Sequence, residues 1–272
     1  MSNFRTVLVT GASSGIGQAT ARLLAQKRYR VFGTSRHSIS NGSIPQVEMI
    51  TLDVRSDKSV EACVSTVIKK AGRLDILINN AGYELSGALE ETTIDEATGQ
   101  FDTNFLGVLR MIKAALPIMR KQNEGQIINI SSLAGLVGIP FMGMYSASKF
   151  ALEGYSESLR HEVKPFNIHV SMVEPSFLKT PMMNARQLAA HPIGDYDQWR
   201  KQALAAFREF EENAQGPELV ANAVLKIVAS KSPRLRYILG QQAMIVSNLR
   251  RFLPEAMLEQ GIRGNFKLDA RK

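Results

Sequence analysis

The chain has 272 residues, and its 33 lysines and arginines against 25 aspartates and glutamates give a formal net charge of +8. Hydrophobic residues make up 44% and charged residues 21%, which is typical of a soluble globular protein and excludes a disordered or fibrous chain; the single cysteine excludes an internal disulfide framework. The N-terminal residues do not resemble a signal peptide, and no apolar run approaches the ~20 residues that a membrane-spanning helix needs. We therefore expect a cytoplasmic protein.

Short apolar segments alternate with longer helical patterns through the first 175 residues. The expected strands are rich in β-branched residues and cover 6–10, 30–34, 47–52, 76–79, 126–130 and 168–173. Helices are predicted near 57–71, 95–120 and 144–164, besides one that follows the first strand. Buried strands joined by crossover helices indicate a mostly parallel, doubly wound sheet with helices on both faces.

The pattern changes after residue 175. Residues 180–213 mix helix and loop, and we expect them to form a lid over a substrate. A helix is predicted from Gly216 to about Ala229, followed by a last strand over 236–239 and a basic helical tail over 241–272. With about seven strands and no repeat or flexible linker, residues 1–272 are predicted to form a single α/β domain of Rossmann type with a C-terminal helical extension.

A glycine-rich turn joins the first strand to the first helix. It reads Thr10-Gly11-Ala12-Ser13-Ser14-Gly15-Ile16-Gly17, with its glycines spaced G-x-x-x-G-x-G. Such a turn lets the backbone approach a pyrophosphate, which the free N–H groups at the helix N-terminus bind. Glycines can also serve as simple turn residues. Their place at the start of a βαβ series nevertheless favours a dinucleotide site.

The end of the second strand indicates which dinucleotide is bound. Folds that prefer NAD place an acidic residue here to bind the ribose 2′-hydroxyl, whereas this chain reads Thr34-Ser35-Arg36-His37. Arg36 can pair with a 2′-phosphate through charge-assisted hydrogen bonds; the alternative is an ordinary solvated arginine. We therefore expect NADP(H) to be preferred over NAD(H).

Tyr145 and Lys149 lie four residues apart on one face of a predicted helix. Because a nearby ammonium group stabilises a phenolate, we expect the pKa of Tyr145 to fall below its usual value of about 10, so that the phenol can act as acid or base. A pair with this spacing is often only a surface feature. Here Ser131-Ser132 and Asn79–Gly82 end other strands, at the edge where parallel sheets bind ligands.

Together these motifs resemble the short-chain dehydrogenase/reductases over residues 4–240, and more loosely the NADP(H)-dependent hydroxysteroid and retinol dehydrogenases among them. The resemblance implies that Tyr145 is the catalytic acid/base and that Lys149 holds the nicotinamide ribose and lowers the tyrosine pKa. It also implies that Ser132 binds the reacting oxygen and that Asn104 holds a water in the proton relay. The implied cofactor residues are Gly11, Ser13, Ser14, Gly15, Ile16, Gly17, Ser35, Arg36, Asp53, Val54, Asn80, Ala81, Gly82, Tyr145, Lys149, Pro175 and Thr180.

One position departs from the family. The usual Pro-Gly after the sixth strand is Pro175-Ser176 here, and we expect the serine to restrict the backbone of that loop.

The substrate is only weakly encoded in the sequence. Apolar side chains of the lid and of the segment after Ser132 suit a bulky hydrophobic carbonyl compound or alcohol, although about half of them could be lid core. The expected substrate residues are Ser132, Leu133, Val137, Phe141, Tyr145, Phe177, Met182 and Met183. We predict NADP(H)-dependent hydride transfer between a carbonyl and an alcohol, with reduction the favoured direction. The alternative is a regulatory or sensor protein that binds NADP(H) without turnover.

The remaining features concern metals and partners. The four histidines are too dispersed for a metal site, so none is expected. The segment Phe105–Met119 is apolar nearly all round, which favours a homodimer or homotetramer, as the resemblance also implies. Residues 230–272 carry +6 of the net charge of +8, so the excess positive charge is a local feature of the C-terminal tail. No nucleic-acid-binding motif accompanies it, and no nucleic-acid surface is predicted. The tail side chains expected to pack on the body or on a second subunit are Leu249, Phe252, Leu253, Met257 and Leu258; peripheral attachment to an anionic membrane is the less favoured alternative.

Overall fold

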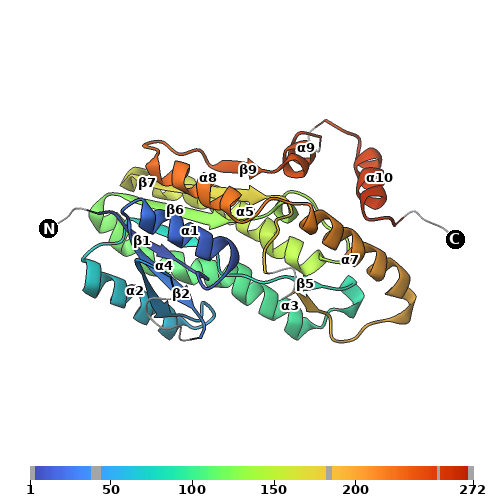
Figure 1. Cartoon of the computed structure of the whole chain (residues 1–272), viewed down its shortest axis with the longest axis horizontal. Coiled ribbons are helices and arrows are strands. Elements are labelled where there is room, and N and C mark those ends of the chain that lie inside the picture. Colours follow the sequence, from blue (N-terminus) through green and yellow to red (C-terminus); the bar gives the residue numbers. More distant parts are fainter. Residues whose placement is uncertain (1–3, 38–43, 182–185, 250–251, 269–272) are drawn as a thin grey trace.

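The computed structural model describes residues 4–37, 44–181, 186–249 and 252–268. Seven parallel strands form its central sheet in the order β3-β2-β1-β4-β6-β7-β9 (Figure 1). Their bounds are β1 Thr6–Val9, β2 Arg30–Ser35, β3 Val47–Thr51, β4 Ile76–Asn79, β6 Gly125–Ile130, β7 Ile168–Pro175 and β9 Arg236–Leu239. The chain builds outward from β1 to β3, returns beside β1 at β4, and continues to β9. This strand order confirms the predicted Rossmann-type, doubly wound α/β class.

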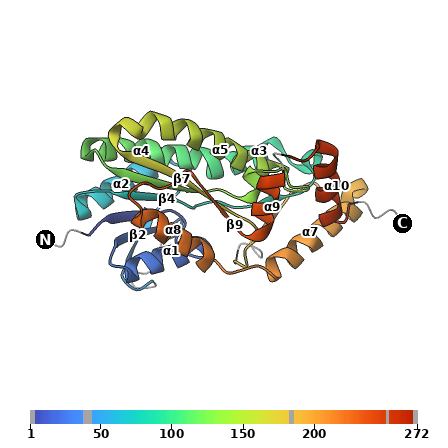
Figure 2. The same cartoon turned by 90° about the horizontal axis from the view of Figure 1, so that it is seen from above.

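Helices cover both faces of the sheet, as Figure 2 shows. One face carries α1 (Gly15–Gln26) and α8 (Glu218–Ala229), and the other carries α2 (Asp57–Ala71), α4 (Gly107–Gln122) and α5 (Gly143–Val163). Side chains of β1 alternate between the two cores: Val7 and Val9 pack toward α1 and α8, whereas Leu8 packs toward the other layer. Because both faces are covered, the strands have continuous apolar sequences.

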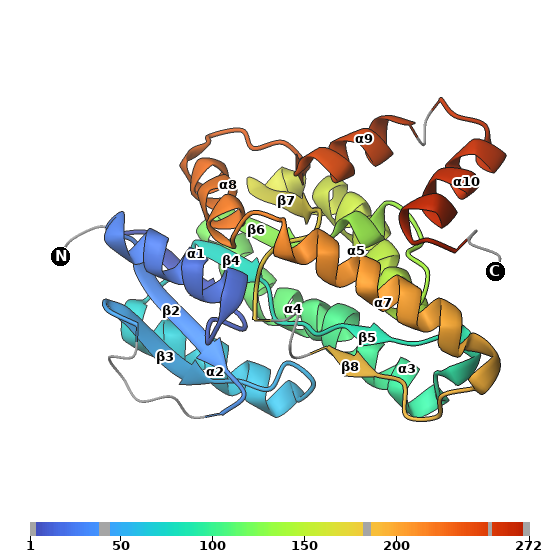
Figure 3. The same ribbon diagram turned by 45° about the vertical axis from the view of Figure 1, so that its right-hand side comes forward.

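Shorter elements lie beyond the carboxyl ends of the strands. They include a two-stranded parallel sheet, β5 (Leu85–Ser86) with β8 (Gln187–Leu188), and the helices α3 (Ile94–Phe101) and α7 (Asp197–Glu212). Figure 3 shows α7 in orange, with β5 and β8 beneath it. Helix α7 lies within the segment predicted as a lid.

The helix predicted over 95–120 is present but interrupted. A π-helical turn, Asp102–Leu106, separates α3 from α4. A π turn holds one residue more than an α turn and often occurs at functional sites. Most of the apolar surface of α4 is buried inside the molecule, including Met111 and Ile112, while Leu106 is 39% exposed.

The basic tail forms two helices, α9 (Gln241–Leu249) and α10 (Glu255–Asn265). Phe252 and Met257 are largely exposed in the single chain, and the deepest contacts of the tail come from Ala243 and Phe266; the predicted packing of the tail on a second subunit stays a prediction. Leu253 and Leu258 are half-buried, and the side chain of Leu249 lies outside the described residues. Within the described part of the chain, no helix combines the length and the apolarity needed to cross a bilayer.

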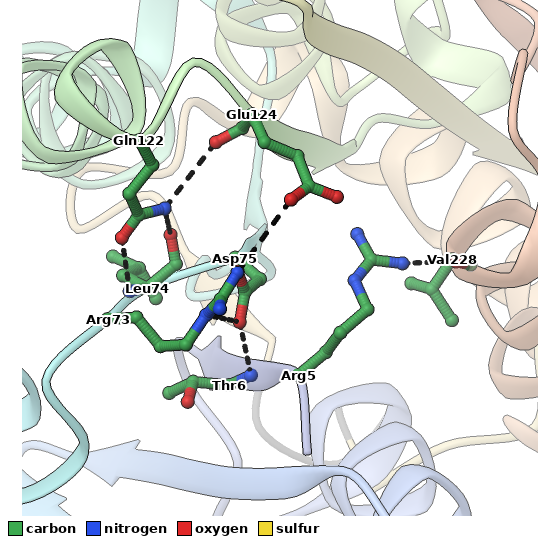
Figure 4. Close-up of polar contacts among 8 residues, drawn as sticks. All are labelled: Arg5, Thr6, Arg73, Leu74, Asp75, Gln122, Glu124 and Val228. Atoms are coloured by element: carbon green, nitrogen blue, oxygen red, sulfur yellow. Dashed lines mark hydrogen bonds and ion pairs between the residues drawn. The ribbon is translucent and has the colours of Figure 1, made fainter. Parts of the chain in front are cut away.

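Hydrogen bonds and an ion pair between polar side chains connect the segments at the amino-terminal edge of the sheet (Figure 4). The fully buried Asp75 accepts a hydrogen bond from the Thr6 backbone N–H at 2.7 Å, and Arg73 donates to both of its carboxylate oxygens. The Gln122 side chain bonds both backbone groups of Leu74, at 3.1 and 2.9 Å. These contacts tie the start of β1 to the segment that enters β4 and to the end of α4.

Candidate active site

A cleft of about 520 Å³ opens at the carboxyl-terminal edge of the sheet. Residues from the ends of β1, β2, β4, β6 and β7 line it, as expected for the ligand site of a parallel sheet. The predicted cofactor residues in its wall are Gly11, Ser13, Ser14, Gly15, Ile16, Ser35, Arg36, Asp53, Val54, Asn80, Ala81, Gly82, Tyr145, Lys149, Pro175 and Thr180. Gly17 is the exception, because it lies behind the glycine turn.

Each glycine of the turn meets a different steric demand. Gly11 and Gly15 adopt left-handed backbone angles, with φ of 65° and 53°. A Cβ on Gly11 would also lie 2.9 Å from the Cα of Ala81. A Cβ on Gly17 would lie 2.2 Å from the carbonyl oxygen of Gly11, so Gly17 allows α1 to approach the turn instead of facing the cleft.

The ends of β1 and β4 are fastened together beside this turn. The Asn80 side-chain amide donates to the carbonyl oxygens of Thr10 and Gly11, at 2.9 and 3.0 Å. The Thr10 hydroxyl accepts hydrogen bonds from the backbone N–H groups of Asn80 and Ala81. Ser14, the N-cap of α1, makes no side-chain capping bond, and the first turn has no acidic residue. The helix N-terminus therefore offers N–H donors and a positive dipole end, which fit a dinucleotide pyrophosphate.

Two guanidinium groups stand where a ribose phosphate would be recognised. Arg36 is exposed in the cleft wall, as predicted. Arg55 also lines the cleft and pairs with Asp53 at 3.0 Å, and this contact lowers the pKa of the Asp53 carboxyl, with a smaller contribution from Arg36. Sequence reasoning missed Arg55, whose place near Arg36 depends on the loop that follows β3.

The predicted catalytic side chains of Ser132, Tyr145 and Lys149 meet in the cleft. The Ser132 hydroxyl caps a short 3-10 turn, accepting from the Ala134 N–H at 3.1 Å, and it interacts with the Tyr145 phenol strongly enough to oppose the rise of the phenol's pKa. The Lys149 ammonium donates to the carbonyl oxygen of Ile130 at 2.8 Å and lies 5.6 Å from the centroid of the Tyr145 ring. The i, i+4 spacing on α5 thus places both side chains on the face toward the end of β6.

The ionisation of this pair differs from the prediction. Burial raises the pKa of Tyr145 above its usual value, and the charge of Glu84 adds to the rise, whereas the Ser132 hydrogen bond opposes it. The pKa of Tyr145 is therefore raised and not lowered as predicted, because burial outweighs the interactions that favour the phenolate. Burial lowers the pKa of Lys149 to about 8, against the charges of Glu84 and Glu153. At neutral pH the phenol is protonated and most of the lysine is charged.

Asn104 lies in the π-helical turn and lines the cleft, although it is only 1% exposed. Its side-chain oxygen accepts from the Tyr83 N–H at 3.1 Å, and its amide donates to the Tyr83 carbonyl at 3.0 Å. The amide is also 3.4 Å from the Ser148 hydroxyl. These bonds fix Asn104 beside the catalytic helix; its implied role in holding a water stays a prediction.

Only some of the predicted substrate residues line the cleft. Leu133 and Phe177 line the cleft with Ser132 and Tyr145. Val137 and Phe141 do not, because Val137 is buried in the outer apolar cluster and Phe141 packs against that cluster. Met182 and Met183 lie outside the described residues. The apolar lining residues that sequence reasoning missed include Ile139 and Met142, whereas Leu178, which it had considered for the pocket wall, does line the cleft.

Charged residues also line the cleft without having been predicted. Glu84, Arg186 and Glu211 come from three separate segments of the chain and were not identified from the sequence. No local motif brings them together, since their proximity arises from the pairing of β5 with β8 and from the packing of α7. The wall beside Tyr145 is therefore not purely apolar.

The departure at Ser176 is accommodated by a distant glycine. Ser176 does not adopt a positive φ, and its N–H donates to the Leu239 carbonyl at 2.8 Å. Gly240 has a φ of 91°, and a Cβ there would lie 2.0 Å from the Ser176 hydroxyl oxygen. The end of β9 therefore provides the space that the serine needs, and Pro175 keeps its predicted place in the cleft wall.

A buried polar network lies behind the catalytic helix. Glu153 of α5 bonds both the Ser131 hydroxyl and Arg236, and Arg236 also bonds Glu174 of β7. Burial and the neighbouring Glu153 raise the pKa of Glu174 to about 8, while Arg236 opposes the rise. Glu174 is an acidic residue within an apolar strand, which was the available sequence signal for this network.

Comparisons with known proteins agree with this geometry. The family model described as short chain dehydrogenase matches residues 5–190. A 3-ketodihydrosphingosine reductase of Bacteroides thetaiotaomicron is 42% identical over 260 residues, which cover 94% of this chain and 96% of that protein. Retinol dehydrogenase 8 of Bos taurus is 38% identical over 252 residues, covering 85% and 80%. A solved short-chain dehydrogenase from Streptomyces avermitilis has a TM-score of 0.83 and 30% identity, covering 99% of this chain and 100% of that one.

Two further similar structures contain nicotinamide cofactors. ElxO with NADP bound has a TM-score of 0.72 at 27% identity, covering 87% of this chain and 96% of its own. A Burkholderia phymatum short chain dehydrogenase/reductase in complex with NAD has a TM-score of 0.79 at 25% identity, covering 94% and 95%. Since both cofactors occur among the similar structures, the choice between them depends on the residues of each chain.

Proposed function

The chain belongs to the short-chain dehydrogenase/reductase family, and from that premise we propose that it reduces a carbonyl compound to an alcohol with NADPH. The observation that carries the proposal is the meeting of Ser132, Tyr145 and Lys149 in one cleft with the glycine-rich turn. A protein that only sensed NADP(H) would not need a phenol and an ammonium group placed together beside a serine hydroxyl.

The chemistry follows from the positions of these groups. When bound, the reduced nicotinamide supplies a hydride to the carbonyl carbon. Tyr145 gives its phenolic proton to the carbonyl oxygen, and Ser132 donates a hydrogen bond to the same oxygen as negative charge develops there. Burial keeps the phenol protonated before the reaction because it raises the Tyr145 pKa. The Lys149 ammonium stabilises the phenolate that remains.

The preference for NADP(H) is proposed from the residues at the end of β2. Arg36 stands there in place of a carboxylate, and Arg55 adds a second guanidinium to the same part of the cleft wall. A ribose 2′-phosphate can accept charge-assisted hydrogen bonds from such groups, whereas a 2′-hydroxyl gains less from them.

A bulky hydrophobic substrate is proposed from the cleft wall and from the relatives. Leu133 and Phe177 offer an apolar surface in the cluster against which Tyr145 packs, and Phe177 is stacked on Phe210 with ring centroids 4.9 Å apart. The two relatives are named for 3-ketodihydrosphingosine and for retinol, which are long and apolar. The role of residues 180–213 as a lid stays a prediction.

We also propose that the chain forms a homodimer or homotetramer. Leu106, the last residue of the π-helical turn before α4, is 39% exposed, and Phe150 of α5 is 37% exposed. Light scattering at micromolar concentration should give at least twice the chain mass, and a monomer would contradict the proposal. A cytoplasmic location also stays a prediction.

The activity can be tested in two steps with the full chain. NADPH fluorescence on titration with the protein should report binding, and NADPH should then be consumed with some members of a panel of long-chain ketones, aldehydes and quinones. Binding of NADPH without consumption across the panel would favour the regulatory alternative. Absence of NADPH binding would contradict both.

A further inference from the structure

Glu153 continues the row of side chains on α5 that carries Tyr145 and Lys149. The three residues follow one another at steps of four, so they lie on the same side of the helix in successive turns. Glu153 is only 5% exposed, and the proposed reaction does not use it directly. Replacing a buried ion pair by apolar side chains is often neutral or stabilising, so stability alone does not explain a glutamate buried one turn beyond Lys149.

Lys149 and Glu153 bond neighbouring residues at the end of β6. The Lys149 ammonium donates to the Ile130 carbonyl oxygen at 2.8 Å, and the hydroxyl of the next residue, Ser131, donates to Oε1 of Glu153. Ser132 follows directly in the chain. The bond between Ser131 and Glu153 therefore fixes the residue between the carbonyl that holds the lysine and the serine proposed to bind the reacting oxygen.

The turn that Ser132 caps packs on this bond. Gly135 ends the 3-10 turn Leu133–Gly135, and a Cβ on it would lie 2.9 Å from Ser131 Oγ and 3.0 Å from Cγ of Glu153. The glycine thus leaves room for both side chains directly against the turn. A displacement of the Ser131 hydroxyl or of Glu153 would therefore also displace the turn whose N-cap is Ser132.

The second oxygen of Glu153 is held from β9. Arg236 donates to Oε2 of Glu153, and the same guanidinium bonds Glu174 of β7 and Glu157, which is 51% exposed. Glu174 also interacts with Glu153, and burial raises the Glu174 pKa to about 8, so Glu174 is mostly protonated at neutral pH. With one oxygen bonded to β6 and the other to β9, the Glu153 carboxylate is fixed in both position and orientation.

The charge of Glu153 also acts on Lys149. The spacing of four residues on α5 and the bonds to adjacent residues of β6 bring the carboxylate close to the ammonium group. Burial lowers the pKa of Lys149 to about 8, while the charges of Glu84 and Glu153 oppose this fall. Loss of the Glu153 charge would therefore leave a larger fraction of Lys149 neutral near pH 7.

We propose that Glu153 is a positioning residue for the reaction at Tyr145. Its bond to Ser131 holds the end of β6 in place, and its charge keeps Lys149 in the ammonium form that stabilises the phenolate. Glu153 acts only through these two residues, because Ser131 and Lys149 line the cleft and Glu153 does not. The inference rests on the proposed carbonyl reduction, since the groups that Glu153 positions are the groups of that reaction.

The first test measures the ionisation of Lys149 without turnover. The protein is prepared with carbon-13-labelled lysine, and the Cε resonance that is missing from Lys149→Arg is followed against pH by NMR. We expect a midpoint of about 8 in the wild type. The midpoint should be lower by about half a pH unit or more in Glu153→Gln. Glu157→Gln, which removes the exposed partner of the same Arg236, should keep the wild-type midpoint.

The second test follows the reduction of a long-chain ketone by NADPH across pH. In Ser131→Ala, kcat should fall about tenfold with the pH profile of the wild type, because position is changed and charge is not. In Glu153→Gln, kcat should fall at least as far, and the decline of kcat/KM at high pH should begin at lower pH. Glu157→Gln should match the wild type in both quantities. NADPH binding, measured by fluorescence, shows that each variant is folded.

The two tests separate this inference from the proposed function. A wild-type midpoint of Lys149 in Glu153→Gln, or a wild-type kcat and pH profile in that variant, would overturn the positioning role and leave the carbonyl reductase proposal intact. Equal effects of Glu153→Gln and Glu157→Gln would also overturn it, because any partner of Arg236 would then suffice. If the Lys149 midpoint moves as expected but the wild type reduces no ketone, the proposed function fails and the action of Glu153 on the lysine stands.

Discussion

Buried carboxylates occur at both edges of the central sheet, and they are paired differently. At the amino-terminal edge, both oxygens of Asp75 are bonded, to Arg73 and to the Thr6 backbone (Figure 4). At the carboxyl-terminal edge, Glu174 and Glu211 each keep one buried oxygen without a partner among the described residues. The buried carboxylate at the first edge is fully paired, whereas the two at the second edge are incompletely paired.

This difference distinguishes carboxylates that stabilise the fold from carboxylates that lie beside the candidate active site. A fully paired buried carboxylate contributes to holding the strands together, whereas an incompletely paired one is unfavourable unless a ligand completes it. Burial also shifts the pKa of Lys149 down to about 8 and that of Glu174 up to about 8. Perturbed groups of this kind concentrate at functional sites. We therefore expect substitutions at the two edges to change different measured quantities.

The largest effect is expected from Tyr145→Phe at the carboxyl-terminal edge. Removing the proton donor should lower kcat by about a thousandfold, equivalent to about 4 kcal/mol, because general acid catalysis is lost. The free energy of unfolding should change by less than about 1 kcal/mol, since the hydroxyl is the only group removed. Steady-state kinetics and urea unfolding measure the two quantities. Retained turnover would remove Tyr145 from the mechanism.

The converse pattern is expected from Asp75→Ala at the amino-terminal edge. The free energy of unfolding should fall by about 3 kcal/mol, because the Thr6 N–H loses its buried acceptor and Arg73 loses its ion pair. The kcat of the folded protein should be unchanged. Asp57→Ala, an exposed carboxylate that also pairs with an arginine, should change the unfolding free energy by less than about 1 kcal/mol. A large loss of kcat in Asp75→Ala would contradict the separation of the two edges.

A smaller effect is expected from Arg36→Ala at the cofactor end of the cleft. The KM for NADPH should rise about tenfold to a hundredfold, since hydrogen bonds to a charged group contribute about 1.5–3 kcal/mol. The KM for NADH should stay within about twofold, because NADH lacks the 2′-phosphate. Arg22→Ala, an exposed arginine on α1 outside the cleft wall, serves as the matched control. An unchanged ratio of the two KM values would contradict the assignment of Arg36 to the ribose 2′-phosphate.

The smallest effect concerns the pH dependence of stability. The folded pKa of Glu174, about 8, exceeds its usual 4.5, so the native state holds a proton that the unfolded state has lost between these values. Its stabilising contribution is therefore complete below pH 4.5 and is lost as the pH rises to about 8.

Glu174→Gln should reduce the fall in unfolding free energy between about pH 5 and about pH 8, by about 1 kcal/mol or more. The measurement is urea unfolding at both pH values. Glu157→Gln, a half-exposed carboxylate on the same Arg236, should leave the fall as it is in the wild type. Identical slopes for Glu174→Gln and the wild type would show that Glu174 is ionised throughout this range.

Much of the fold and of the cofactor cleft could be predicted from the sequence because the signals are local. The seven strands are short apolar runs, and the glycine turn has a local steric cause at Gly17, where a Cβ would meet the Gly11 carbonyl oxygen. The pair Tyr145 and Lys149 needs only helical spacing to meet. The positions of these residues follow once the strand order places their carboxyl ends at one edge.

What could not be predicted depends on contacts between distant segments. The π turn at Asp102–Leu106 has no local sequence signature, and the meeting of Glu84, Arg186 and Glu211 requires the β5–β8 pairing and the seating of α7. The direction of the Tyr145 pKa was wrong because helical spacing shows the neighbouring lysine but not the burial of the phenol.

The most direct test of the chemistry assigned to the carboxyl-terminal edge follows the hydride itself. NADPH deuterated at the transferable position of the nicotinamide is incubated with the protein and a long-chain ketone that it consumes, and the product is examined by mass spectrometry. We expect one deuterium on the carbinol carbon of the alcohol with the wild type, and almost none at the same time with Tyr145→Phe. Alcohol formed without the label, or equal labelling by Tyr145→Phe, would contradict hydride transfer assisted by this tyrosine.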